Sequence, residues 1–202
     1  TTRFDEAADE HGFIIAYPNG TGIVPTWNAG RCCGEAARNN VDDEAFIDAM
    51  ITEIVAEYPI DQARIYAAGH SNGGMLALRF ACQLAHRFAG VAAVGASLEV
   101  PIEGCFPAKP LSVLLIHGTA DENHPLEGGQ GTNSFSNVDY TSVAASMEGL
   151  RTVMGCTDTT EILEGYGPVT TTRWTGCTNG VIVEQQIIDG ASHAWPGGRP
   201  GL

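Results

Sequence analysis

The sequence predicts an α/β fold in which a mainly parallel sheet is covered by helices on both faces. Expected strands and helices alternate along the chain, as they do when parallel strands are joined by crossover helices. The strands expected at 91–97 (V-A-A-V-G-A-S) and 111–118 (L-S-V-L-L-I-H-G) are nearly continuous apolar runs, which is typical of strands buried on both sides. A length of 202 residues suits one compact domain, so we expect 1–202 to form a single domain.

The first part of the chain is expected to contain two helices and two strands around a long loop. Phe4, Ala7 and Ala8 recur at helical spacing, and Asp42 or Asp43 can cap the second helix. The apolar run G-F-I-I-A-Y-P-N-G is closed by turn residues and predicts a buried strand. The expected elements are a helix over 1–10, a strand at 12–20, a loop at 21–40, a helix that starts within 41–43 and runs to about 58, and a strand at 63–68.

The second part repeats the alternation. The pattern M-L-A-L-R-F-A-C-Q-L is helical, and T-T-T-R-W-T and V-I-V-E-Q-Q-I-I resemble strands. Asp139 stands where the last helix is expected to begin and is best explained as its cap. The expected elements are a helix over 72–85, strands at 91–97 and 111–118, a helix over 138–154, and strands at 170–175 and 181–188.

Composition and charge exclude several classes of partner. The net charge of −14 disfavours phosphate backbones and anionic lipid, so we expect neither a nucleic acid nor a membrane partner. The apolar runs are too short to span a bilayer. Histidines, acids and cysteines lack the spacing of metal ligands, so neither a metal nor another cofactor is expected.

The even number of cysteines in this acidic chain favours disulfides and therefore an oxidising compartment. We expect a secreted, periplasmic or cell-surface protein. Cys156 and Cys177 flank a short segment and are expected to form one bridge. Neighbouring cysteines rarely bond to each other, so two further bridges should join the pair Cys32 and Cys33 to the pair Cys82 and Cys105, in an order that the sequence leaves open.

The stretch Y-A-A-G-H-S-N-G-G-M places a serine between an expected strand and an expected helix. Gly69, Ser71 and Gly73 form G-x-S-x-G, which at a strand–turn–helix junction makes a sharp elbow that exposes the serine. The N–H groups at the start of the helix point to the same place and favour an oxyanion, with the backbone of Asn72 as the first donor. Ser71 is therefore predicted to be a nucleophile; the alternative is a structural serine in a glycine-rich turn.

A serine nucleophile needs a base and an acid that orients the base. In this type of fold the acid follows the serine along the chain. Asp121 comes directly after the strong apolar strand at 111–118 and is the preferred acid. Glu99 also follows a strand and is the main rival, while Glu122 and Asp139 are weaker candidates.

The base should come last in the chain, after a late strand. His193 alone meets this requirement, in the glycine-flanked loop G-A-S-H-A-W-P-G-G. His70 is adjacent to the serine and His124 is close to the acid, so both are candidates for lining a substrate cleft. These residues predict an esterase in which His193 activates the serine and water hydrolyses the acyl-enzyme.

Several motifs, in this order, resemble the polyhydroxybutyrate depolymerase and feruloyl esterase-like (LpqC-type) family of α/β-hydrolases. They are T-W-N-A-G-R-C-C-G, N-V-D-D-E-A-F-I, G-H-S-N-G-G-M, I-H-G-T-A-D and G-A-S-H-A-W-P-G. The resemblance implies the triad Ser71, Asp121 and His193, secretion, and an aryl, feruloyl, acetyl or hydroxyalkanoate ester as substrate. It also implies that Trp27 and Trp195 lie near the cleft, although packing explains both equally well.

The chain departs from this family at both ends. Members begin with strands that would precede Thr1, and a His-Gly loop after the last of them carries the second oxyanion N–H. The family also adds a closing helix after the position of Leu202. The resemblance therefore implies a fragment or a naturally short form, with a bare sheet edge that a second copy of the chain could cover. A missing oxyanion donor typically costs about 100–1000-fold in turnover, so we expect a weak esterase or, alternatively, a non-catalytic binding remnant.

Overall fold

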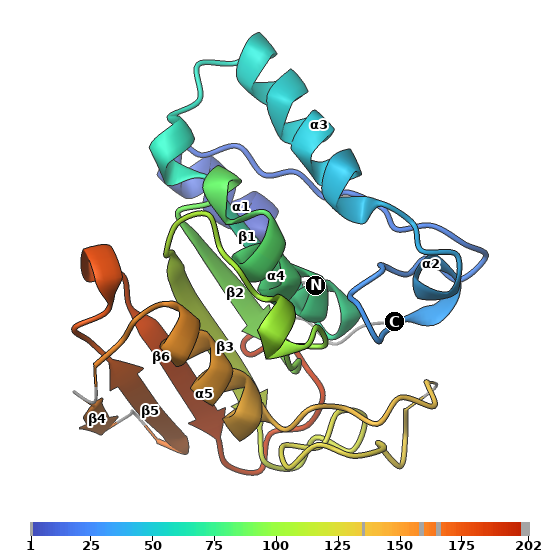
Figure 1. Cartoon of the computed structure of the whole chain (residues 1–202), viewed down its shortest axis with the longest axis vertical. Coiled ribbons are helices and arrows are strands. Elements are labelled where there is room, and N and C mark those ends of the chain that lie inside the picture. Colours follow the sequence, from blue (N-terminus) through green and yellow to red (C-terminus); the bar gives the residue numbers. More distant parts are fainter. Residues whose placement is uncertain (1, 135, 158–159, 165–166, 199–202) are drawn as a thin grey trace.

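Figure 1 shows a computed structural model of the chain. The structure describes residues 2–134, 136–157, 160–164 and 167–198, with 160–164 described by the backbone alone.

The centre of the molecule is a six-stranded sheet in the order β1-β2-β3-β6-β5-β4. β1, β2, β3 and β6 are parallel to one another, whereas β5 is antiparallel to β6 and to β4. Parallel pairing brings the carboxyl ends of β1, β2, β3 and β6 to one edge of the sheet, where ligands of open α/β sheets bind. The strands are β1 (Tyr66–His70), β2 (Gly90–Val94), β3 (Ser112–Gly118), β4 (Thr160–Glu164), β5 (Val169–Trp174) and β6 (Val183–Ile188).

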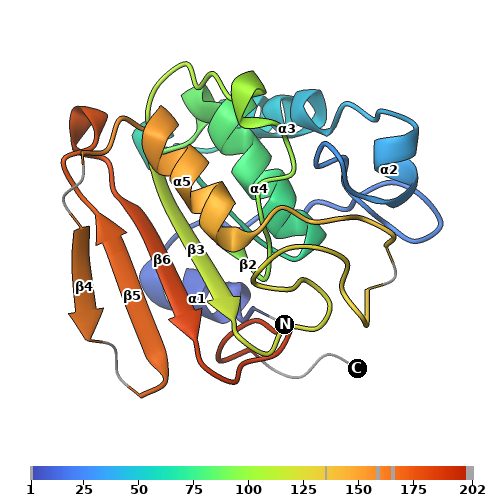
Figure 2. The same ribbon diagram turned by 60° about the horizontal axis from the view of Figure 1, so that its bottom comes forward.

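Helices cover both faces of the sheet, as predicted for this α/β-hydrolase fold. Figure 2 shows α4 and α5 across one face and α1 behind the other. The helices are α1 (Phe4–His11), α2 (Gly34–Arg38), α3 (Asp43–Glu57), α4 (Asn72–Gln83) and α5 (Val143–Val153), with 3-10 turns at Gln62–Arg64, Ala85–Arg87, Ile102–Gly104 and Thr178–Gly180. None of the helices in the described ranges is long and apolar enough to cross a bilayer.

The core lies between the sheet and its α4/α5 layer. Met75 and Leu78 of α4, Leu115 of β3, and Met147 and Leu150 of α5 are at most 1% exposed. Their burial follows from sequence, because the apolar positions of both helices recur at helical spacing and the strand is an almost continuous apolar run. This layer fixes the start of α4 against the end of β1.

The expected strand at 12–20 was wrong. The segment has no strand structure, and Phe13, Ile14 and Tyr17 are 44–57% exposed. It lines an apolar cavity of about 1100 Å³, together with α3, α4 and the outer side of β1. A strand needs a neighbour for its backbone hydrogen bonds, and among the described residues no strand pairs with that edge of β1. Coverage of this bare edge by a second copy of the chain stays a prediction.

Three smaller expectations also need correction. The loop expected at 21–40 contains the short helix α2. The strand β4 was not predicted, because T-E-I-L-E has no clear alternation and pairs only at the outer side of β5. Helix α5 begins after Ser142, whose side chain accepts from the Ala145 N–H; Asp139 lies before that cap and does not provide it. By contrast, Asp42 caps α3 as expected.

The disulfide prediction was right for one bridge and wrong for the others. Cys156 bonds to Cys177 as predicted. Cys82, at the end of α4, bonds to Cys105 after the 3-10 turn at Ile102–Gly104. Cys32 and Cys33 bond to each other across a cis peptide, with Cα atoms 3.1 Å apart. The prediction rested on the rarity of bonds between neighbouring cysteines, and this chain contains one.

Candidate active site

Ser71 lies at a sharp bend between β1 and α4, as the G-x-S-x-G pattern predicts. Its backbone angles, φ 55° and ψ −125°, are unusual for a residue with a side chain. Such strain persists only where the surroundings enforce it, and it is often found at functional sites. A Cβ on Gly69 would lie 2.2 Å from the carbonyl of Gly73, so only glycine permits this close approach. A Cβ on Gly73 would meet nothing within 4 Å, so that glycine contributes its backbone rather than its own lack of a side chain.

The hydroxyl of Ser71 is not used to cap the helix that follows it. Ser71 is the N-cap residue of α4, yet its side chain makes no capping hydrogen bond. The first helical bond runs from the Met75 N–H to the Ser71 carbonyl, at 2.9 Å. The N–H groups of residues 72–74 precede that bond and carry the positive end of the helix dipole. This is the position expected for an oxyanion donor from the Asn72 backbone.

Asp121 and His193 form a direct hydrogen bond. His193 Nδ1 lies 2.7 Å from Asp121 Oδ2, although the two residues are 72 positions apart in the chain. Asp121 follows β3 and His193 follows β6, and these neighbouring parallel strands end at the same edge of the sheet. If Nδ1 carries the ring proton, Nε2 is left as the acceptor that a general base needs.

Two contacts bring the His193 ring close to the elbow. The rings of His70 and His193 have centroids 4.6 Å apart and planes tilted by 41°, and His70 directly precedes Ser71. On the other side, the Ser71 N–H bonds to the Val94 carbonyl at the end of β2. The next residue, Gly95, lies under the imidazole: a Cβ there would be 3.1 Å from His193 Nδ1 and 3.3 Å from Asp121 Oδ2.

Gly95 was missed in the sequence. Its φ of +58° and its contact with the His193–Asp121 pair require a residue without a side chain. The signal was present, because this glycine interrupts an apolar strand at the same sheet edge as the predicted acid.

The carboxylate of Asp121 is buried, being 5% exposed, and is surrounded by donors. Its Oδ1 accepts the backbone N–H groups of Asn123 and His124 at 3.0 and 2.8 Å. His117 Nε2 lies 3.6 Å from Oδ2. Burial acts to raise the pKa of Asp121, but the bonds from His193 and the His124 N–H outweigh it and leave this pKa below its usual value. Asp121 is therefore held ionised, as an acid that orients a base must be.

The histidines around the pair are neutral at ordinary pH. Burial, with help from the neighbouring His193, lowers the pKa of His70 to about 4. Burial and the nearby His117 lower that of His124 to about 3. Burial also lowers the pKa of His117. Because these neighbouring rings are neutral, they do not repel the positive charge that would form on His193 during general-base catalysis.

Glu99, the rival acid, is engaged elsewhere. It is fully buried and pairs with Arg31 at 3.0 Å. Its Oε1 also accepts from the Ser97 hydroxyl and from the Thr141 N–H, at 2.7 and 3.0 Å. These contacts explain why a buried carboxylate is tolerated there, and they favour Asp121 as the partner of His193.

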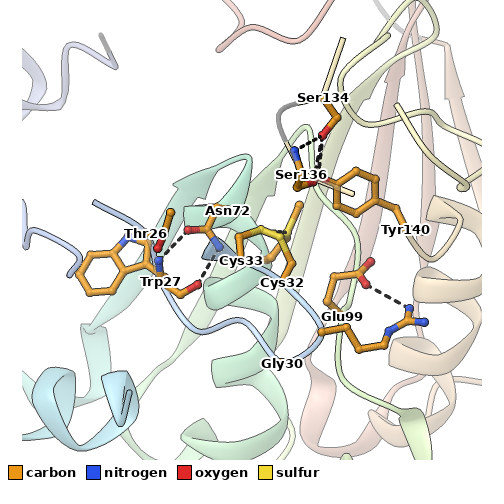
Figure 3. Close-up of a disulfide and its surroundings, with 12 residues drawn as sticks. Thr26, Trp27, Gly30, Cys32, Cys33, Asn72, Glu99, Ser134, Ser136 and Tyr140 are labelled. Carbon is orange, nitrogen blue, oxygen red and sulfur yellow. Dashed lines mark hydrogen bonds and ion pairs between the residues drawn. A yellow bond between two sulfur atoms is a disulfide. The ribbon is translucent and has the colours of Figure 1, made fainter. Parts of the chain in front are cut away.

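The side chain of Asn72 fastens the loop that carries the neighbouring cysteines (Figure 3). Its Oδ1 accepts the Trp27 N–H at 2.7 Å, and its Nδ2 donates to the Trp27 carbonyl at 3.0 Å. The same carbonyl accepts the Cys33 N–H at 3.1 Å. The residue whose backbone N–H would bind the oxyanion is thus held by both its helix and this loop.

The four predicted substrate contacts fall in different environments. Trp27 and Trp195 line the apolar cavity beside β1, where Trp27 stacks on Phe46 and Trp195 meets Phe4 edge-on. His70 lines the same cavity. His124 is only 1% exposed and does not line that cavity, so its predicted place in a substrate cleft stays a prediction.

Within the described residues, no cluster of three or more His, Cys, Asp or Glu side chains is arranged to hold a metal ion.

The fold is that of an α/β hydrolase, and the chain belongs to the phospholipase/carboxylesterase family, whose model matches residues 14–151. It is 31% identical to feruloyl esterase B of Piromyces equi over 202 residues, an alignment that covers 97% of this chain and 36% of the relative. It is also 31% identical to feruloyl esterase C of Emericella nidulans over 177 residues, covering 87% of this chain and 56% of the relative. The chain thus spans between about a third and somewhat over half the length of these relatives.

Among solved structures, an acetyl xylan esterase from Aspergillus awamori has a similar fold. The superposition gives a TM-score of 0.69 at 16% sequence identity and covers 96% of this chain and 77% of that one. At this identity the likeness supports the fold alone. None of these comparisons bears on a polyhydroxybutyrate depolymerase, so that part of the predicted resemblance stays a prediction.

Proposed function

We propose that this protein is a carboxylic ester hydrolase that works through Ser71, His193 and Asp121. The observation that carries the proposal is the 2.7 Å bond between His193 and Asp121 at the sheet edge where the strained Ser71 projects. The family to which the chain belongs supports the reaction class.

In the proposed reaction, His193 Nε2 accepts the hydroxyl proton as Ser71 attacks the ester carbonyl. Asp121 keeps the other ring proton on Nδ1 and stabilises the imidazolium. The Asn72 N–H, at the start of α4, donates to the tetrahedral oxyanion. The protonated His193 then gives its proton to the leaving alcohol, and water attacks the acyl-enzyme by the reverse sequence.

For the substrate we propose a short or aromatic acyl ester, such as an acetyl or feruloyl ester of plant cell-wall carbohydrate. The printed names of the two sequence relatives, both feruloyl esterases, support the feruloyl ester. The acetyl ester rests on the sequence motifs. Trp27, His70 and Trp195 line one apolar cavity and are the proposed contacts for an aromatic or alkyl group. A hydroxyalkanoate ester is a further candidate that rests on the sequence motifs alone.

We also propose export to an oxidising compartment. Its support is that all six cysteines pair in three disulfides, a density that is rare in reducing cytosol.

The test is a panel of methyl ferulate, p-nitrophenyl acetate, acetylated xylan and polyhydroxybutyrate, assayed with the parent protein and with Ser71→Ala. We expect hydrolysis of at least one small ester by the parent, and loss of that activity on substitution. Activity that survives Ser71→Ala would remove the proposed nucleophile. A parent protein that hydrolyses none of the four would favour the alternative, a non-catalytic binding remnant of a hydrolase.

A further inference from the structure

Behind the His193–Asp121 pair lies a second group of buried polar side chains that the proposed reaction does not use. Ser97, Glu99 and His124 are each at most 1% exposed. Ser97 Oγ lies 2.7 Å from Glu99 Oε1 and 2.7 Å from His124 Nε2. The hydroxyl therefore joins a carboxylate to an imidazole in a continuous hydrogen-bonded chain.

The direction of these hydrogen bonds follows from the chemistry of the groups. The ion pair with Arg31 identifies Glu99 as a carboxylate, which can only accept. The single proton of Ser97 must then go to Glu99, so Ser97 accepts a proton from His124 Nε2. The low pKa of His124, about 3, agrees with this assignment, since a neutral ring has only one N–H to give.

The same histidine holds the triad acid through its backbone. The His124 N–H donates to Asp121 Oδ1 at 2.8 Å, and the His124 carbonyl accepts from His117 Nε2 at 2.8 Å. Its ring also stacks on Tyr140, with centroids 4.1 Å apart. Figure 3 shows Tyr140 beside Glu99, with its hydroxyl at Ser134 and Ser136. The turn that carries Asp121 is thus fixed by a side chain whose only ring proton points at Ser97.

We propose that Glu99, Ser97 and His124 act as positioning residues for Asp121, with Glu99 working through Ser97 and the His124 ring. This inference rests on the proposed triad and extends it. Glu99, which the sequence suggests as an alternative to Asp121, would instead help to position Asp121. Small displacements of a catalytic group cost about 100-fold per ångström, so a loosened Asp121 turn should be visible in kcat.

The decisive variants keep the shape of the network and remove its bonds. His124→Phe preserves a ring that can stack on Tyr140 but has no N–H, whereas His124→Gln places an amide N–H at a similar reach. Ser97→Ala removes the link to Glu99. Ser146→Ala is the matched control: Ser146 is 2% exposed and bonds to the Leu98 N–H and the Ser142 carbonyl, but it does not touch His124.

Each variant is compared by kcat and KM on p-nitrophenyl acetate, per active site titrated with a fluorophosphonate, and by the acid limb of the kcat/KM profile. We expect Ser97→Ala and His124→Phe to lower kcat about 10- to 100-fold with little change in KM. A displaced Asp121 stabilises the protonated base less, so the acid limb should move to lower pH. His124→Gln should recover much of kcat, and Ser146→Ala should match the parent.

A second readout does not depend on turnover. The proton shared by His193 and Asp121 should give a far-downfield ¹H resonance in the parent and in Ser146→Ala, and should weaken or shift in Ser97→Ala and His124→Phe. If those two variants match the control in kcat, in acid limb and in this resonance, the positioning role is refuted. If the parent shows the resonance but hydrolyses no ester, the proposed function is refuted. The positioning role is then tested by comparing the resonance of Ser97→Ala and His124→Phe with that of the parent and of Ser146→Ala.

Discussion

Replacing Asp121 by asparagine should leave the site folded and yet inactivate it. Oδ1 of Asp121 accepts two backbone N–H groups, from Asn123 and His124. An amide at this position must keep its oxygen there, because its NH₂ group cannot accept. The NH₂ would then face His193 Nδ1, now 2.7 Å from Oδ2. A donor at that place binds only an unprotonated Nδ1, so the ring proton would move to Nε2, the atom that must receive the serine proton.

The size of the effect follows from this tautomer change. The equivalent substitution in a Ser-His-Asp triad lowers kcat by about 10⁴ while preserving geometry, which corresponds to about 5.5 kcal/mol of transition-state stabilisation. We expect a loss of this order for Asp121→Asn in kcat/KM on p-nitrophenyl acetate at neutral pH. Near-UV circular dichroism and the thermal midpoint should confirm that the variant is folded.

Asp43→Asn is the matched control for Asp121→Asn. Asp43 is also buried, at 3% exposure, and also accepts a backbone N–H, that of Asn28. Its substitution should affect stability rather than chemistry and leave kcat/KM within about tenfold of the parent. If Asp121→Asn retains activity to the same degree as this control, Asp121 is not the triad acid and the reasoning from the tautomer is wrong.

Three further predictions concern the scaffold of the site. Replacing Cys82 and Cys105 by alanine opens a loop with a sequence separation of 23, which by chain entropy should cost about 3 kcal/mol and lower the thermal midpoint by roughly 6–12 °C; an unchanged midpoint would contradict the bridge. Gly69→Ala should reduce hydrolysis about 100-fold or prevent folding, because its Cβ meets the Gly73 carbonyl, whereas Gly73→Ala should stay within about tenfold; equal effects would refute the elbow geometry. The lowered pKa of Asp121 adds to the free energy of unfolding; this contribution is complete above the unfolded pKa of 3.8 and is lost as pH falls through the lower folded pKa. Asp121→Asn should therefore weaken the decrease of this free energy at acid pH, as measured by urea unfolding. An unchanged dependence of the unfolding free energy on pH would contradict the lowered pKa.

The strands and helices that surround the proposed triad could be predicted because their apolar patterns agree with their neighbours. The strand at 111–118 and the helix that follows Ser71 are buried by the sheet they belong to, so local pattern and tertiary environment coincide. The segment 12–20 has an equally apolar pattern but lines a cavity, and in the described part of the chain no strand pairs with it. The periodicity of a segment shows which side chains it could bury, but not whether another strand is available to pair with its backbone.

Pairings between distant side chains were only partly predictable. Order along the chain and position after a strand suffice to bring His193 to Asp121. The bond between Cys32 and Cys33 depends on one peptide geometry that residue types do not reveal. The role of Glu99 was also hidden, because its contacts with Arg31 and Thr141 depend on how three separate loops fold together. The sequence predicts both Glu99 and Asp121 as candidate acids, and only the contact between Asp121 and His193 distinguishes them.

The central claim is that Ser71 is a reactive nucleophile activated by His193, and covalent labelling tests it most directly. The parent, Ser71→Ala and His193→Ala are each treated with a fluorophosphonate probe, and the modified peptide is identified by mass spectrometry. The account predicts one label per chain, on Ser71, absent from Ser71→Ala and strongly slowed in His193→Ala. Labelling at another residue, or at Ser71 with equal speed in the absence of the His193 imidazole, would contradict it.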